Sequence, residues 1–359
     1  MPKFFAYLTT SYIKIWLATV FGFLVLIGLL DSLANSGDII GEGGKFSDTF
    51  LYMFYRAPVI FDRVFILTIL VGLLLLFVKL IRQHELVALL GFGISVPKQI
   101  MLLIPAVIGA SLISITTINT FMPSSVRALQ AWGIGEYKVK NVTPENPLWF
   151  EDNQQIVRAS YRPNRNTLGN VEIFSREVDG RITDYKLATR AWYNGENWEL
   201  TGVKRLQILA ADGRDLDAEV IPEKVIWESA QTPSSIARLA AEPRDLSLKD
   251  MKSFSERGNS GAKPRFAYGF WHAHRLTRPI AAFVLLLCAI PIMQNVGRQD
   301  TGDRALVMGI LMGFIYLIID GALATFATTG GMSIAAAIIS PFILFGLLGS
   351  YLCLRSETL

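Results

Sequence analysis

The chain has 359 residues, of which 52% are hydrophobic and 18% are charged, and its mean hydropathy is +0.39. So few charges in a chain of this length indicate a membrane protein. The net charge of +4 does not indicate nucleic-acid binding, because residues 122–278 hold 43 of the 64 charges and mix both signs. Cys288 and Cys353 both lie in apolar stretches, which excludes a disulfide framework or a cysteine-based zinc site in that segment.

Six apolar stretches are long enough to cross a bilayer core, which takes about 20 helical residues. We do not interpret the first as a cleaved signal peptide, because its apolar run is long and Ala34-Asn35-Ser36 is a poor cleavage site. We therefore predict a membrane α-helical protein with six transmembrane helices, at Ile13–Leu33, Val59–Ile81, Ile100–Met122, Pro279–Val296, Ala305–Ala327 and Met332–Leu354.

Positive charges in the short loops predict the orientation of these spans. The side that holds both termini carries Lys3, Lys14, Lys79, Arg82, Lys98, Arg298, Arg304 and Arg355. On the opposite side, the acids outnumber the bases, with Asp38, Glu42 and Asp48 against Lys45 and Arg56. The positive-inside rule therefore places both termini in the cytoplasm and the long segment between the third and fourth spans outside.

That long segment alternates apolar with polar residues, a pattern typical of β-strands. The expected strands are Gln155–Tyr161, Val171–Val178, Ile182–Trp192, Trp198–Leu209 and Val225–Ser229. The pairs Asp179-Gly180, Asn194-Gly195 and Asp212-Gly213 favour hairpin turns between several of them. Strands at this spacing predict a sandwich, a jelly roll or an open barrel.

Two helices and a linker are expected after the strands. Pro233 begins one helical stretch, Ser247–Ser255 forms another, and Glu256–Pro264 is rich in Gly, Ser and Lys, as linkers are. The predicted domains are transmembrane helices at 1–122, an extramembrane β domain with its helical linker at 123–267, and transmembrane helices at 268–359.

The residues predict no nucleotide or metal site and no catalytic group. Gly44-Lys45 is followed by Phe46, whereas a phosphate-binding P-loop needs Ser or Thr at that position. The three histidines, His84, His272 and His274, have no metal-ligand spacing and are expected at the membrane interface. We expect a chain that is not an enzyme and holds no cofactor, so that another chain supplies the energy for any uphill transport.

Residues 83–95, between the second and third spans, predict a short cytoplasmic helix that stops near Gly91 and Gly93. Leu86, Leu89 and Leu90 share one face of this helix by their spacing. An apolar face in the cytoplasm lies either on lipid head groups or in a groove of another protein, and composition leaves both alternatives open.

The string Glu85-Leu86-Val87-Ala88-Leu89, with Gly91, Gly93, Ile94 and Ser95 after it, resembles the coupling helix of the lipopolysaccharide export permeases of the LptF/LptG family. The resemblance covers nearly the whole chain. The sequence around Trp271 and Asp320 resembles the LptG branch more than the LptF branch. Its further landmarks are Pro147-Leu148-Trp149, Asp245-Leu246-Ser247, Phe270-Trp271-His272, Arg278-Pro279 and Phe314-Ile315-Tyr316.

This resemblance implies six transmembrane helices with an inserted all-β periplasmic jellyroll-like domain. It implies a permease subunit of the ABC transporter that extracts lipopolysaccharide from the outer leaflet of the bacterial inner membrane. The implied partners are an LptF-like permease, an LptB-like ATPase dimer that binds ATP and Mg, an LptC-like membrane-anchored jellyroll and an LptA-like bridge. The paralogous LptF subunit remains an alternative identity.

The resemblance also suggests which residues couple the helix to the ATPase: Glu85, Leu86, Ala88, Leu89, Leu90, Gly91 and Gly93. The Glu85 carboxylate favours the dipole of the helix and could also meet a basic residue of the ATPase. Asp320, in the middle of the fifth span, needs a cavity or a partner, so it serves coupling, the substrate path or a structural hydrogen bond. We expect no proton relay there, because we identify no second acid in the neighbouring spans.

Gly309 and Gly313 form a small-xxx-small pair in the fifth span. In this family the first and fifth spans form lateral gates against the other subunit. A glycine pair suits such a gate, and ordinary packing within the chain is the alternative.

Substrate phosphates need cations at the outer rim of an apolar cavity, and the candidates are Lys45, Arg56, Arg63 and Arg127. Contact with ordinary lipid phosphates is the alternative for each. Members of the family often carry a lysine pair where this chain has Ala34 and Asn35. The candidate jellyroll interior, which either guides acyl chains or fills a core, is Ile156, Ile173, Trp192, Trp198 and Leu200.

A membrane sensor or adaptor with a ligand-binding β domain is the rival function. Two expectations favour the permease. We predict no cytoplasmic output domain in the sequence, and a sensor has no need of an apolar cytoplasmic helix between the second and third spans.

Overall fold

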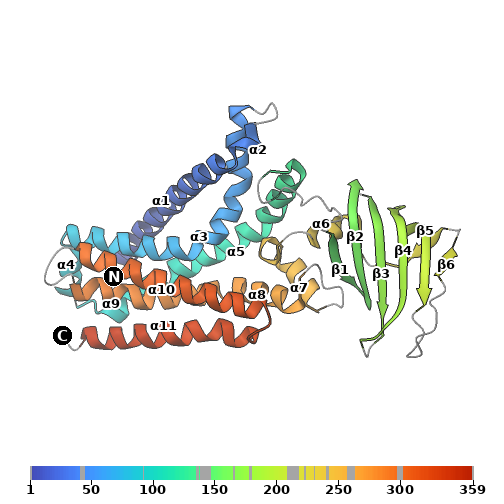
Figure 1. The fold of residues 1–359 in the computed structure, drawn as a ribbon. Helices are drawn as coiled ribbons and strands as arrows, with labels where there is room; N and C mark the ends of the chain where they lie inside the picture. Colours follow the sequence, from blue (N-terminus) through green and yellow to red (C-terminus); the bar gives the residue numbers. More distant parts are fainter. Residues whose placement is uncertain are drawn as a thin grey trace. The chain divides into compact units, whose positions relative to one another are not determined.

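The computed structural model describes residues 2–40, 45–91, 93–134, 137, 147–164, 166–177, 180–207, 218–221, 224–229, 231–239, 242–256, 263–296 and 302–357. The chain divides into two compact units (Figure 1). The helical unit consists of Met1–Val126 and His272–Leu359, and the β unit consists of Arg127–Trp271.

The helical unit is built around α3, which packs against α1, α9 and α10. In the most apolar window of α3, 67% of the residues are buried, against 17% in that of α1. The helices that lie wholly or partly in this unit are α1 (Pro2–Ala34), α2 (Ser36–Ile40), α3 (Phe46–Arg82), α4 (Glu85–Gly91), α5 (Val96–Trp132), α8 (Arg265–Leu276), α9 (Arg278–Val296), α10 (Gly302–Thr328) and α11 (Ile334–Glu357).

Five helices, α1, α3, α5, α10 and α11, are long and apolar enough to cross a membrane. The predicted fourth span corresponds to α8 and α9, which pass the same test together and are bent by 54° at their junction. Proline cannot donate a backbone hydrogen bond, so the helix breaks before Pro279, which then lies in the first turn of α9. The described helices thus confirm five to six membrane-spanning segments.

The β unit contains the expected strands as β2 (Gln155–Asn164), β3 (Thr167–Arg176), β4 (Ile182–Tyr193), β5 (Trp198–Gln207) and β7 (Val225–Trp227). Two strands were not predicted, β1 (Leu148–Asp152) and β6 (Ala218–Ile221). The two predicted helices appear as α6 (Pro233–Leu239) and α7 (Leu248–Glu256), with a 3-10 turn, η2 (Pro243–Asp245), between them.

Two of the predicted glycine turns are seen directly, since Gly180 has φ +87° and Gly195 has φ +111°. Side chains other than glycine adopt such values only with strain. The remaining turn at Asp212-Gly213, the strand ends at Val178 and Leu209, and linker residues 257–262 lie outside the described residues.

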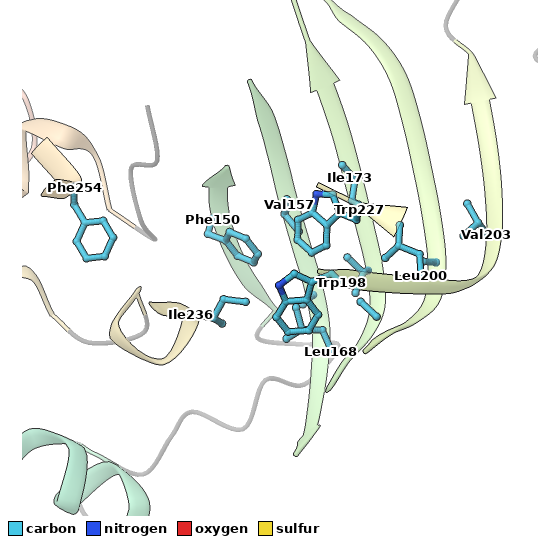
Figure 2. Close-up of a cluster of buried hydrophobic side chains, with 14 of the residues drawn as sticks. Phe150, Val157, Leu168, Ile173, Trp198, Leu200, Val203, Trp227, Ile236 and Phe254 are labelled. Atoms are coloured by element: carbon cyan, nitrogen blue, oxygen red, sulfur yellow. The ribbon is translucent and has the colours of Figure 1, made fainter. Parts of the chain in front are cut away.

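All seven described strands form one antiparallel sheet in the order β1-β2-β3-β4-β5-β6, with β7 beside the first part of β5. The predicted β domain between the two sets of helices is thus confirmed, and within the described strands β7 returns to pair with β5. One face of the sheet carries the hydrophobic core of the unit. Figure 2 shows Trp198 and Trp227 in this core, between the strands and the segment that carries Ile236.

Candidate functional site: the short helix α4 and the charged clusters of the helical unit

Helix α4 follows α3 after a two-residue turn. His84 in that turn has φ +58°, and its carbonyl accepts a hydrogen bond from the Ala88 backbone at 3.4 Å. After the helix, Gly93 has φ +73°, and the Ile94 backbone N–H donates to the Leu89 carbonyl at 3.1 Å. Gly93 therefore marks the predicted helix stop, where a left-handed residue ends the hydrogen-bonded turns.

The apolar face of α4 is turned toward its own chain. Leu86 and Leu89 are each only 4% exposed, and α4 packs against α3. This corrects the expectation that these leucines meet lipid or a partner, because the chain itself already buries them. The outward face consists of Val87, which is 65% exposed, with Ala88 and Gly91. The side chain of Leu90 lies outside the described residues.

Glu85 lies in the first turn of α4, and its carboxylate accepts hydrogen bonds from the Tyr7 hydroxyl, 3.0 Å from each oxygen. Tyr7 is on α1, and the Lys79 ammonium of α3 lies 5.7 Å from the centre of its ring. Glu85 thus connects α4 to α1, a contact that the sequence did not predict because it spans 78 positions.

The four candidate rim cations are not equivalent. Arg56 is 4% exposed, and its Nε donates to the Asp31 carboxylate at 2.7 Å. The Tyr52 hydroxyl donates to the same carboxylate oxygen at 2.9 Å. The prediction that Arg56 faces the substrate is therefore wrong, because this arginine is buried between α1 and α3, where it binds Asp31.

The other three candidates are exposed but do not form one cluster. Lys45 precedes α3, and its backbone N–H is capped by Asp48 at 2.7 Å. Arg63 lies 18 residues further along the same helix, which corresponds to roughly 27 Å at 1.5 Å per residue. Arg127 belongs to the β unit.

Asp320 of α10 is paired with a histidine that sequence reasoning assigned to the membrane interface. The His274 Nε2 atom of α8 lies 3.1 Å from one Asp320 oxygen and 3.3 Å from the other. Both side chains are about one fifth exposed. The structural hydrogen bond is the alternative that the geometry supports, and it joins α8 to α10.

Acids besides Asp320 lie within the membrane helices, contrary to the sequence-based expectation: Asp31 of α1, described above, and Asp62 of α3. Asp62 of α3 is 3% exposed and forms an ion pair with Arg278 of α9, while the Arg275 guanidinium lies 4.0 Å away. Arg278 also donates to the Ser114 hydroxyl at 3.3 Å, and its guanidinium lies 5.6 Å from the centre of the Phe65 ring. This cluster connects α3, α5, α8 and α9. The sequence feature that could have indicated it is the charge of Asp62 inside the predicted second span.

Gly309 and Gly313 pack within the chain. A Cβ atom at Gly309 would overlap the Leu74 side chain, and one at Gly313 would overlap Leu70. Both leucines belong to α3, so the glycine pair allows α10 to approach α3 closely. Packing within the chain, rather than a gate, accounts for this pair.

We expect Gly313→Ala to destabilise the helical unit by about 1–3 kcal/mol, because the new methyl group forces Leu70 out of its position. Gly321→Ala in the same helix is the matched control, since a Cβ atom there would meet no neighbour within 4 Å. That control should be neutral or gain up to about 1 kcal/mol from helix propensity. Thermal unfolding of the purified variants in detergent measures both, and equal stabilities would contradict the close contact.

In the β unit, Ile173, Trp198 and Leu200 lie in the buried cluster, each 1% exposed. The prediction for Ile156 is wrong, because its neighbour Val157 faces the core and successive strand residues point to opposite faces. The Trp198 indole N–H is satisfied by the Gln231 carbonyl at 2.7 Å. The cluster is thus a filled hydrophobic core.

Trp192, also predicted to lie inside, is 47% exposed. Its neighbour Ala191 pairs with Leu200 in the core, so Trp192 points to the opposite face, where it lies across from Glu199. The Glu199 carboxylate accepts hydrogen bonds from Asn194 at 3.1 Å and Lys224 at 3.2 Å, which hold the pKa of Glu199 below its usual value. This face of the sheet carries charged side chains beside exposed apolar ones, since Ile226, across from Glu199, is 64% exposed.

Within the described ranges, no group of three or more His, Cys, Asp or Glu side chains is arranged to hold a metal ion.

Comparison with known proteins gives consistent matches. The model of the family described as lipopolysaccharide export system permease LptF/LptG matches residues 6–355. The lipopolysaccharide export system permease protein LptG of Haemophilus influenzae is 22% identical over 208 residues, which cover 56% of this chain and 56% of that protein. LptG of Escherichia coli K12 is 19% identical over 346 residues, 92% of this chain and 91% of that protein.

Proposed function

This chain belongs to the LptF/LptG family of lipopolysaccharide export permeases, and from that premise we propose that it is the LptG-type subunit of an ATP-driven lipopolysaccharide extractor. The packing and the exposed surface of α4 support the proposal that ATP hydrolysis in another protein drives the extraction. Helix α4 packs against α3 and buries its leucines, and its small outward residues, Val87, Ala88 and Gly91, leave a surface that another protein can approach closely. A force applied to that surface would be transmitted directly to the central helix.

We propose that the chain is a multi-pass protein of the bacterial inner membrane with both termini in the cytoplasm and the β unit in the periplasm. The supporting argument is the excess of Lys and Arg in the short loops on the side of α4. ATP and Mg would bind to a partner ATPase dimer on that side.

The second permease would contact the outer parts of α1 and α10, which the helical unit leaves uncovered. Leu26, Leu30 and Leu33 of α1 are 57%, 59% and 69% exposed, and they recur at helical spacing. Leu311 and Ile318 of α10 are 58% and 68% exposed. We infer that these faces meet an LptF-like subunit and enclose the lipid cavity between the two chains.

Substrate phosphates would bind at the outer rim, where Lys45 and Arg63 remain as candidates in the helical unit and Arg127 in the β unit. The β unit would then pass the lipid toward LptC-like and LptA-like proteins. Its edge strand β1 pairs only with β2 among the described strands, so a partner strand could add there.

The test is purification of the tagged full-length chain from detergent-solubilised membranes, followed by reconstitution of whatever co-purifies. We expect an ATPase and a second six-span protein, and release of lipopolysaccharide from proteoliposomes to an acceptor only when ATP is added. Recovery of the chain with a signalling protein and no ATPase would contradict the proposal. Release of lipopolysaccharide without ATP would contradict only the proposal that ATP hydrolysis supplies the energy.

A further inference from the structure

A groove of about 470 Å3 with both polar and apolar lining residues opens between α1 and α3, at the end of the helical unit that carries α4. It is lined by Ala6, Tyr7, Thr10, Ser11, Lys14 and Ile15 of α1 and by Lys79 of α3. The groove borders the coupling helix, because Tyr7 in its wall donates a hydrogen bond to Glu85 of α4.

The polar lining comes from one stripe of α1. Tyr7, Thr10, Ser11 and Lys14 are spaced by three, four and seven residues, which places them on the same side of a helix. This stripe lies inside Phe5–Ala34, a segment apolar enough to span a membrane. The span predicted from the sequence begins at Ile13, so these hydroxyl and ammonium groups lie at its end, at the level of the lipid headgroups.

The lining residues of the groove carry positive charge only, and the Glu85 carboxylate borders the groove through its hydrogen bond from Tyr7. Lys14 is exposed and Lys79 is half-buried, and none of the seven lining residues is acidic. Thr10 and Ser11 add hydroxyl donors beside the two ammonium groups. Two cations with hydroxyl donors match the oxygens of a phosphate, and basic pockets between transmembrane helices on the cytoplasmic side favour anionic lipid headgroups.

An apolar path leads away from the groove along α1. Ile13, Leu17 and Phe21 follow one another every four residues and are 37%, 54% and 69% exposed. Acyl chains attached to a headgroup in the groove could lie along these side chains, whereas a free phosphate would make no use of them. This continuity favours a lipid over a soluble anion.

We propose that the groove binds the phosphate of an anionic glycerophospholipid, with Lys14 and Lys79 as its cations and Thr10 and Ser11 as hydrogen-bond donors. This proposal rests on the proposed function only for placing the groove on the cytoplasmic side of the membrane. Because Tyr7 joins the groove to Glu85, a bound headgroup stabilises the arrangement in which α4 is held against α1.

Native mass spectrometry of the delipidated full-length chain in detergent tests this proposal. We would titrate phosphatidylglycerol and phosphatidylcholine separately, and add inorganic phosphate as a competitor. The wild type should bind one phosphatidylglycerol in preference to phosphatidylcholine. Lys14→Gln with Lys79→Gln should weaken that binding roughly thirtyfold, while Lys14→Arg with Lys79→Arg should keep most of it.

Arg82→Gln with Lys98→Gln is the matched control, because it removes two cations from the same end of the unit but outside the groove. Thermal unfolding of every variant would identify any loss of binding that follows from loss of fold. Equal binding of the two lipids, or equal losses in the control, would overturn the proposal. Displacement of the lipid by millimolar inorganic phosphate would assign the groove to a free anion and overturn the lipid part. No outcome involves ATPase or lipopolysaccharide, so failure here leaves the proposed function standing.

Discussion

We expect Val87→Asp to separate the chain from its ATPase while leaving the helical unit folded. Val87 is 65% exposed on the outward face of α4, so a carboxylate there is solvated in the free chain. In a complex it would be buried at the centre of an apolar contact without a partner. Substitutions at such central positions cost about 2 kcal/mol or more, which corresponds to roughly thirtyfold weaker binding.

Leu89→Ala should instead destabilise the fold while the folded protein still binds the ATPase. Leu89 is 4% exposed, so the substitution leaves a cavity beneath α4 and should lower stability by about 2–5 kcal/mol. Co-purification of the ATPase, measured against thermal unfolding in detergent, separates the two variants. Val220→Asp, at an equally exposed valine of β6, is the control for the added charge. The outward face would be assigned wrongly if the Val87→Asp variant still co-purified with the ATPase and the folded Leu89→Ala variant did not.

The membrane helices were predictable because lipid imposes a simple rule on composition and length. Every predicted span has a helical counterpart, and the ends differ where helices extend beyond the bilayer core, as α1 does toward Pro2. The strands with alternating residues were predictable for a similar reason. Strand β1 was missed because Leu148–Asp152 ends in two acids, and β6 was missed because acids precede it.

The direction in which a side chain points was less predictable than the element that carries it. Trp192 and Ile156 lie on predicted strands, yet a shift of one position moves a residue to the other face of the sheet. Leu86 and Leu89 share an apolar stripe, as predicted, but the pattern does not reveal that the chain itself buries it. A stripe predicts burial, and only the tertiary structure identifies the partner.

Charge pairs were the least predictable feature of the helical unit. Arg56 was predicted to face a substrate because it lies near the outer end of a span, and its partner Asp31 lies 25 positions away. Asp62 and Arg278 are separated by 216 positions. No local pattern connects such residues, because their proximity depends on how the helices pack.

The buried cluster around Asp62 gives the largest expected effect on stability. Its carboxylate faces two guanidinium groups, those of Arg275 and Arg278, and the three side chains are 1%, 2% and 5% exposed. Removing the carboxylate takes away the ion-pair partner of Arg278 in a medium of low polarity. Breaking a buried ion pair from one side costs about 3–5 kcal/mol, so we expect Asp62→Ala to remove most of the folded protein from detergent extracts.

The neighbouring arginine provides a control that separates stability from transport. Arg63 is exposed one residue further along α3, so Arg63→Ala should change stability by less than about 1 kcal/mol while testing a candidate contact to substrate phosphate. Asp62→Leu combined with Arg278→Leu should be less destabilising than the sum of the two single substitutions, because the pair is then removed together. Thermal unfolding of the wild type, the two single variants and the double variant measures this coupling. Additive losses would show that Asp62 and Arg278 act independently, and would place the origin of the effect in the remaining contact between Asp62 and Arg275.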